Sequence, residues 1–170
     1  GWPVEDRFVH WVVTNPIWMQ AVGTAIPAAA APSTSVRLVD LTRPSAWQVE
    51  RDPASRASVT AADAGAGLSL HYAVAGGERR AQYVAFALSP VEGLAQAAAV
   101  RVTLSADRPM RLSIQLREPL GRGDGRRWRR SLVVTPEAVS QTIRLDDLRP
   151  VDPGPARAPL DRVHALLLVV

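Results

Sequence analysis

The chain has no cysteine, and this absence excludes several kinds of site at once. Without a thiol there is no disulfide, zinc finger, iron–sulfur centre or cysteine nucleophile. A long apolar run is also missing: the longest, residues 165–170, falls far short of the roughly 20 residues that span a bilayer. We therefore expect no membrane span, while the cellular compartment stays open.

Lysine is absent as well, so all 20 basic residues are arginine. We interpret this bias, together with the abundant alanine and proline, as the codon usage of a GC-rich, bacterial-type genome. The isoelectric point of about 10.8 reflects arginine, while the net charge is only +4. Because most arginines are scattered, nucleic acid is not the expected partner.

What is present suits a folded domain. Of the 170 residues, 47% are hydrophobic and 21% charged, which allows a substantial core and argues against disorder. The chain starts at Gly1-Trp2-Pro3 and stops inside an apolar run, 165–170, which reads as a buried strand. Since domains usually end in polar segments, we expect a piece of a longer protein, with its last domain truncated at the C-terminus.

From residue 36 onward, apolar and polar residues alternate with a period of two. Turn-forming segments rich in glycine, proline and aspartate separate the alternating runs. Short strands at this spacing predict an all-β, antiparallel β-sandwich of the jelly-roll type and not a βαβ fold. The clearest runs are 68–74, 83–88, 100–105 and 110–117.

The turn at residues 106–109 joins two of these runs. We predict that they pair as an antiparallel hairpin, with Val102, Leu104, Leu112 and Ile114 on one buried face.

Two segments precede the sandwich. Residues 1–19 contain a β-prone run closed by Asn15-Pro16, which favours a turn. Residues 20–35 are dominated by alanine, proline, serine and threonine, and Pro27 and Pro32 bracket a run of alanines too short to hold a helix. We expect domains at 1–19 and 36–170, joined by an exposed linker.

The sequence gives little support for a catalytic site. The three histidines, His10, His71 and His164, are isolated, and none has a second histidine at metal-ligand spacing. Asp146 and Asp147 are adjacent, so on a strand they would point to opposite faces, and a strand-end turn is the better interpretation. We expect no catalytic residue, metal ligand or cofactor in this chain.

The segment 121–130 concentrates five arginines behind three glycines. It could be a loop that binds phosphate, acidic glycan or nucleic acid. The favoured alternative is a glycine hairpin loop that leads into a strand whose Trp128 faces the core. The triplet Arg122-Gly123-Asp124 matches an adhesion motif, but three residues recur by chance.

The candidate ligand-binding residues are Gln115, Arg117, Trp128 and Trp47. The first three would lie on the mixed face of the sheet. Trp47 would either stack on a sugar ring or cap the core.

One part of the sequence resembles a known family. The run Arg7-Phe8-Val9-His10-Trp11-Val12-Val13-Thr14-Asn15-Pro16-Ile17-Trp18 looks like the closing strand of PHP-superfamily metallohydrolases. Residues 47–50, 115–117, 127–128 and 166–170 resemble the galactose-binding-like sandwich appended to such domains, a type that includes carbohydrate-binding modules.

The resemblance implies a non-catalytic accessory sandwich of a PHP-type, metal-dependent hydrolase. The divalent metals and their ligands would then belong to an upstream domain of the same chain, the expected partner. Two alternatives remain: a free-standing carbohydrate-binding module with a glycan partner, and a structural interaction domain.

Overall fold

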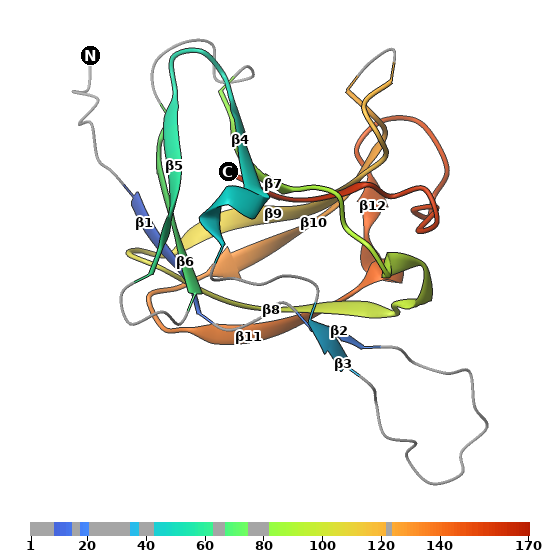
Figure 1. Cartoon of the computed structure of the whole chain (residues 1–170), viewed down its shortest axis with the longest axis horizontal. Helices are drawn as coiled ribbons and strands as arrows, with labels where there is room; N and C mark the ends of the chain where they lie inside the picture. The colour runs from blue at the N-terminus through green and yellow to red at the C-terminus, as the bar shows by residue number, and fades with distance from the viewer. Residues whose placement is uncertain are drawn as a thin grey trace, which may run out of the picture.

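Two antiparallel sheets pack face to face in the computed structural model of the protein (Figure 1). The structure describes residues 9–14, 18–20, 35–37, 43–62, 67–74, 82–121 and 124–170, the first three ranges as backbone only. All strand pairings between described residues are antiparallel. The predicted antiparallel β-sandwich is therefore confirmed.

One sheet has seven strands, in the order β3-β2-β8-β1-β6-β5, with β11 paired to the free side of β8. Their bounds are β1 Val9–Thr14, β2 Trp18–Gln20, β3 Ser35–Arg37, β5 Arg56–Ala61, β6 Gly67–Ala73, β8 Ala99–Ala106 and β11 Val139–Arg144.

The other sheet has six strands, in the order β12-β10-β9-β13-β7-β4. Their bounds are β4 Trp47–Arg51, β7 Val84–Leu88, β9 Met110–Arg117, β10 Arg127–Val134, β12 Arg149–Pro150 and β13 Ala165–Val169. Short 3-10 helices η1 (Pro44–Ala46), η3 (Leu94–Gln96) and η4 (Leu145–Asp147) connect strands. No helix among the described residues is long and apolar enough to cross a membrane.

The core fills the space between the sheets, and the period-two pattern explains which side chains enter it. Successive side chains of a strand point to opposite faces, so every second residue turns inward. The inward residues of β6, β7, β8 and β9 are almost fully buried. They are Leu68, Leu70, Tyr72, Val84, Phe86, Leu88, Val100, Val102, Leu104, Leu112, Ile114 and Leu116. The four predicted runs and the buried strand at residues 165–169 are thus confirmed.

The predicted hairpin at residues 106–109 is wrong in its pairing. The four named residues are buried as expected, but β8 pairs with β11, β1 and β2, whereas β9 pairs with β10 and β13. The turn therefore carries the chain from one sheet to the other. Either connection buries the same alternate residues, so the pattern does not distinguish a hairpin from a crossing between sheets.

Two strands come from the segment before the predicted sandwich. β1 pairs with β6 over its whole length and touches β8, and β2 also pairs with β8. Residues 21–34 of the predicted linker lie outside the described residues. The division of the chain at residues 19 and 35 stays a prediction.

Candidate functional site

A groove lies on the outer face of the six-stranded sheet, the face turned away from the core. Its volume is about 1060 Å³. Two of the elements that line it, β4 and the loop between β9 and β10, lie toward the top of the view in Figure 1. The lining residues are Val49, Glu50, Arg51, Tyr83, Gln115, Arg117, Leu120, Asp124, Arg127, Arg129 and Val151.

Beside the lining residues, the middle of the sheet carries outward apolar side chains, called the floor below. Strand register places Arg117 opposite Ala165, and Gln115 in one row with Leu167 and Ala87. These floor residues form a cluster of their own, separate from the core, with exposures of 3% or less: Ala85, Ala87, Ala165 and Leu167. Because alanine side chains are short, longer side chains from neighbouring strands have room to lie over them.

An ion pair crosses this floor. The Arg117 guanidinium donates to both carboxylate oxygens of Glu50, with Nη1–Oε2 at 2.6 Å and Nη2–Oε1 at 2.7 Å. Arg117 is on β9 and Glu50 on β4, with β13 and β7 between them. Three strand spacings correspond to about 14 Å across the sheet, and the register also offsets the two residues along the strands, because Glu50 lies in the row of Ser113 and not of Arg117. Both side chains therefore reach toward each other across the outer face of the sheet.

The pair is well shielded on one side. The side chain of Arg117 is 9% exposed and that of Glu50 is 29% exposed. The Glu50 carboxylate raises the pKa of Arg117 against the opposing effect of burial, so the guanidinium stays charged. Charge-assisted, two-pronged pairs of this kind are among the strongest hydrogen bonds in proteins. The pair therefore fixes the depth of the groove.

Gln115 brings an unsatisfied polar atom to the same floor. The residue is 5% exposed, and its Nε2 donates to Ser113 Oγ at 3.3 Å. Its Oε1 is buried and has no hydrogen-bond partner within the part of the chain that the structure describes. Such an acceptor normally finds a donor, but this atom has no surface open to solvent, so a ligand hydroxyl reaches it only after the Gln115 side chain turns toward the groove that it lines.

Two further arginines line the β10 side of the groove. Arg127 pairs with Arg117 across the strands, and Arg129 pairs with Gln115, so all four side chains share the outer face. Among the described residues, neither Arg127 nor Arg129 makes a side-chain hydrogen bond or an ion pair, and the Nε of Arg127 is also buried. The two guanidinium groups are therefore available to a ligand.

Asp52 holds the opposite wall in place. Its backbone N–H donates to the Tyr83 carbonyl at 3.2 Å, and its Oδ2 accepts from the Tyr83 N–H at 3.2 Å. A hydrogen bond from the Ser55 hydroxyl, assisted by backbone N–H groups of Tyr83, Ala54 and Ser55, lowers the pKa of Asp52 against the opposing effect of desolvation. Tyr83, 43% exposed, is thereby fixed as an aromatic group at the rim.

The loop between β9 and β10 forms the other wall and turns at Gly125. This glycine has φ +69°, which other residues rarely adopt, and a Cβ there would lie 2.5 Å from the Glu118 carbonyl oxygen. The Glu118 N–H donates to the Arg126 carbonyl, and the Arg126 guanidinium pairs with the Glu118 carboxylate, with Nε–Oε2 at 2.8 Å. The predicted glycine hairpin loop is confirmed here; residues 122 and 123 lie outside the described residues.

The structure places both candidate tryptophans in the core, which is the alternative favoured for Trp128 and one of the two open for Trp47, so neither lines the groove as a ligand-binding residue. Trp128 is 1% exposed, packs in the core and donates from Nε1 to the Pro155 carbonyl at 2.9 Å. Trp47 is 6% exposed and belongs to the same core cluster. Trp128 lies opposite Leu116, an inward residue, and so faces away from the groove. Of the four predicted residues, the groove brings together Gln115 and Arg117.

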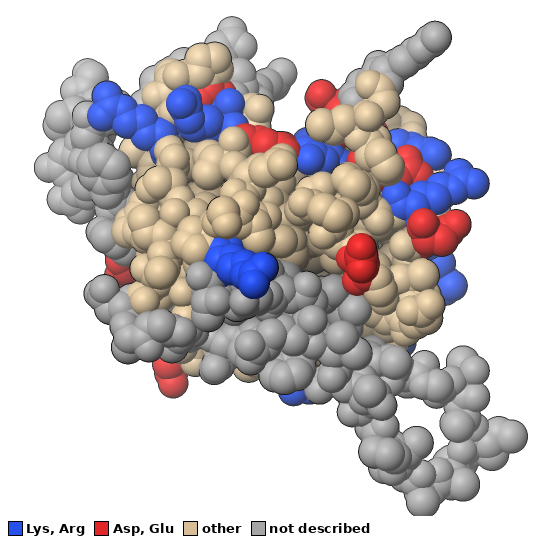
Figure 2. Space-filling model, in the orientation of Figure 1, with Lys and Arg blue, Asp and Glu red and all other residues tan. Residues whose placement is uncertain are grey.

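Several groove residues were missed from the sequence. Glu50 and Tyr83 have no motif of their own, although each occupies the outward position of an alternating run. Figure 2 shows that charged side chains of both signs gather mainly along the upper and right-hand sides of that view, so charge alone does not mark the site.

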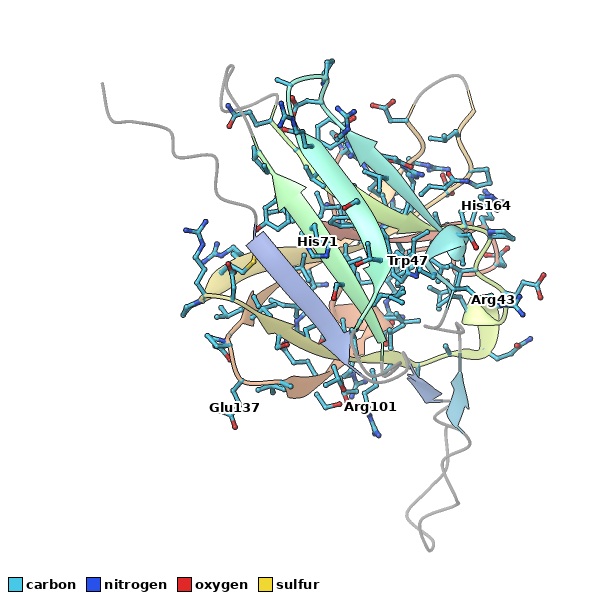
Figure 3. All side chains as sticks on the ribbon, turned by 60° about the vertical axis from the view of Figure 1, so that its left-hand side comes forward. Arg43, Trp47, His71, Arg101, Glu137 and His164 are labelled. Atoms are coloured by element: carbon cyan, nitrogen blue, oxygen red, sulfur yellow. The ribbon has the colours of Figure 1, made fainter. Side chains whose placement is uncertain are left out.

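The remaining polar candidates lie apart from one another. In Figure 3, His71 on β6 and His164, just before β13, are well separated. His71 Nε2 is 3.2 Å from Thr60 Oγ1. Asp146 and Asp147 belong to η4, as a strand-end turn predicts, and Asp147 pairs with Arg130. No cluster of three or more histidine, aspartate or glutamate residues suited to a metal occurs among the described residues.

Comparisons with known proteins identify the fold. No protein-family model matches the chain, and no curated protein matches it. The chain is similar to the solved structure of the family 11 carbohydrate-binding module of the cellulosomal cellulase Lic26A-Cel5E of Clostridium thermocellum, with a TM-score of 0.57 and 13% identity over 72% of this chain and 76% of that one.

A second similar structure is the family 11 carbohydrate-binding module from Clostridium thermocellum in complex with a β-1,3-1,4-mixed-linked tetrasaccharide. Its TM-score is 0.59, with 13% identity over 73% of this chain and 78% of that one. At this identity the likeness shows the β-sandwich fold.

Proposed function

We propose that this domain is a carbohydrate-binding module that holds a glycan chain in the groove on the outer face of the six-stranded sheet. The observation that carries the proposal is the groove itself: a preformed hollow of about 1060 Å³, lined by fixed polar side chains, on a rigid sheet. Two structural neighbours are carbohydrate-binding modules, one of them with an oligosaccharide bound, which supports this choice over a purely structural domain.

The groove offers the contacts that a sugar needs. Gln115 lines the groove, and its amide, once turned toward a ligand, would accept from or donate to a sugar hydroxyl. The exposed rings and chains of Tyr83 and Leu120, which are 43% and 63% exposed, offer apolar surface at the rim for the C–H face of a sugar. An open groove accommodates a chain of sugars and not only a single ring.

The test is binding of the purified chain to a glycan array, followed by calorimetry with the best oligosaccharide. Gln115→Leu and Tyr83→Ala should each weaken binding about tenfold or more, since each removes a contact worth about 1–3 kcal/mol. Arg101→Gln, on the outer face of the opposite sheet, is the control (Figure 3). Binding that is unchanged in both groove variants, or no binding to any glycan, would contradict the proposal.

The resemblance of residues 7–18 to a PHP-type strand supports a second proposal, that the domain is an accessory to a metal-dependent hydrolase. It rests on the sequence alone. Purification of the whole protein and assay of its hydrolase activity with divalent metals tests it. Loss of that activity on metal removal, with glycan binding retained, is the expected result, and a whole protein without hydrolase activity would contradict it.

A further inference from the structure

The charge of the groove indicates which glycans it would select. Four arginines and two carboxylates line it: Arg51, Arg117, Arg127, Arg129, Glu50 and Asp124. One carboxylate, Glu50, is fully engaged by Arg117. Arg51 is engaged as well, because its Nη1 donates to backbone carbonyls of the turn after β4, the closest being Ser55 at 2.6 Å.

Arg127 and Arg129 are left without a partner among the described residues, and their positions are unfavourable without one. Arg127 stands directly opposite Arg117 on the neighbouring strand. Like charges at directly opposite positions destabilise a sheet, and although Glu50 offsets the charge of Arg117, no carboxylate offsets that of Arg127 among the described residues. A ligand anion at the terminal nitrogens of Arg127 would balance this charge.

The two guanidinium groups also have a spacing that suits a repeating ligand. Arg127 and Arg129 are two residues apart on one strand, so their Cα atoms lie about 7 Å apart on the same face. Arginine presents a planar fork that binds carboxylate or sulfate oxygens in pairs. A glycan with anionic groups on nearby sugars would engage both.

The aromatic content of the groove supports the same conclusion. Neutral sugars are held largely by stacking on exposed aromatic rings, and Tyr83 is the single aromatic residue in the described lining. The tryptophans of the described core, Trp47 and Trp128, are buried and unavailable. Recognition through charge is therefore the stronger option that this groove offers.

We infer that the groove selects acidic glycans, whose carboxylate or sulfate groups bind Arg127 and Arg129. This inference rests on the proposed function, because it assigns a substrate class to the same groove. Two adjacent strands would then bind the ligand: Gln115 on β9 would contact a sugar hydroxyl, and Arg127 on β10 would contact an anionic group.

The experiment measures binding by calorimetry to polygalacturonate, to the same polymer with its carboxyl groups reduced, and to a sulfated glycan such as chondroitin sulfate. We expect an acidic polymer to bind at least tenfold more tightly than the reduced one. The two acidic arms distinguish carboxylate from sulfate. The double variant Arg127→Gln/Arg129→Gln should lose roughly ten- to a hundredfold in affinity, as expected for charged hydrogen bonds.

The control is Arg101→Gln/Arg144→Gln, which removes the same charge from exposed positions on the opposite sheet and should keep its affinity. A second variant, Arg127→Lys/Arg129→Lys, keeps the charge but loses the planar guanidinium groups that donate two hydrogen bonds to one anion. It should therefore bind the acidic polymer severalfold more weakly than the parent does. Thermal melts of every variant check that it folds.

Different failures have different meanings. Equal binding to the reduced and the acidic polymer through Gln115 would overturn the acidic preference and leave the proposed function standing. No glycan binding would overturn both. If single-stranded DNA binds as tightly as the glycan, and if its binding falls equally in Arg127→Gln/Arg129→Gln and in Arg101→Gln/Arg144→Gln, the attraction of polyanions is unspecific and the inference is overturned.

Discussion

Loss of one partner of the ion pair between Arg117 and Glu50 should destabilise the whole domain. Glu50→Gln keeps the shape of the side chain but leaves Arg117, whose side chain is 9% exposed, with no carboxylate. Removal of one partner from a fully buried pair costs about 3–5 kcal/mol, whereas exposed pairs contribute about 0–1 kcal/mol. Because Glu50 is 29% exposed, water compensates in part, and we expect about 2 kcal/mol.

The assay is urea unfolding followed by circular dichroism, with thermal melts in parallel. For a chain of 170 residues, 2 kcal/mol corresponds to a fall in Tm of about 4–8 °C. The double variant Glu50→Gln/Arg117→Met completes a cycle in which the coupling energy should be about 1–2 kcal/mol. The matched control is Arg130→Gln, which breaks a pair with Asp147 whose side chains are 42% and 43% exposed, and it should cost less than about 1 kcal/mol.

Two results would refute this reasoning. If Glu50→Gln unfolds within about 0.5 kcal/mol of the parent, the pair does not hold the floor. If the effects of the two single variants simply add in the double variant, the two side chains are not coupled.

Three further predictions concern the scaffold. Ile114→Ala, at a core position 2% exposed, should cost about 2–5 kcal/mol in urea unfolding, whereas Val133→Ala, at a 62% exposed position, should stay within about 0.5 kcal/mol. The lowered pKa of Asp52 means that its carboxylate stabilises the fold above its unfolded pKa of about 4, and that this contribution disappears as the pH falls through the lower folded value. Asp52→Asn should therefore reduce the loss of stability between pH 5 and pH 2, and an unchanged pH profile would contradict this. Gly125→Ala should destabilise by about 1–3 kcal/mol because of its positive φ and a 2.5 Å backbone contact, while Gly121→Ala, with nothing within 4 Å, should have little effect on Tm.

The fold was largely predictable from the sequence because burial in a sandwich follows a period of two. Leu112 and Ile114 were assigned to the core correctly, since an alternating strand must turn its apolar face inward whichever strand it pairs with. The partner of each strand was not predictable in this way. The turn at residues 106–109 shows the reason: it crosses between sheets, and the same alternation fits both connections.

The site was only half predictable for a related reason. Gln115 and Arg117 are polar residues at outward positions of an apolar strand, and local alternation reveals them. Glu50 is a partner of Arg117 only because β13 and β7 separate β4 from β9 by a fixed distance, and this order follows from the topology of the whole sheet. For Trp128 the favoured interpretation, a side chain that faces the core, is confirmed by its register opposite Leu116, and its place among the ligand-binding candidates is wrong.

The position of the groove connects the stability of the domain with its binding. β9 and β13 are interior strands with partners on both sides, so the groove floor moves little. A ligand that binds to side chains already fixed on such strands loses less free energy to ordering them. Arg117 is fixed by Glu50, and Gln115 by Ser113 and its close packing. Arg127 and Arg129, in contrast, have no partner among the described residues, so their side chains become ordered only when a ligand binds them. Only a ligand with groups that bind guanidinium repays the cost of this ordering, so selectivity should depend on these two residues.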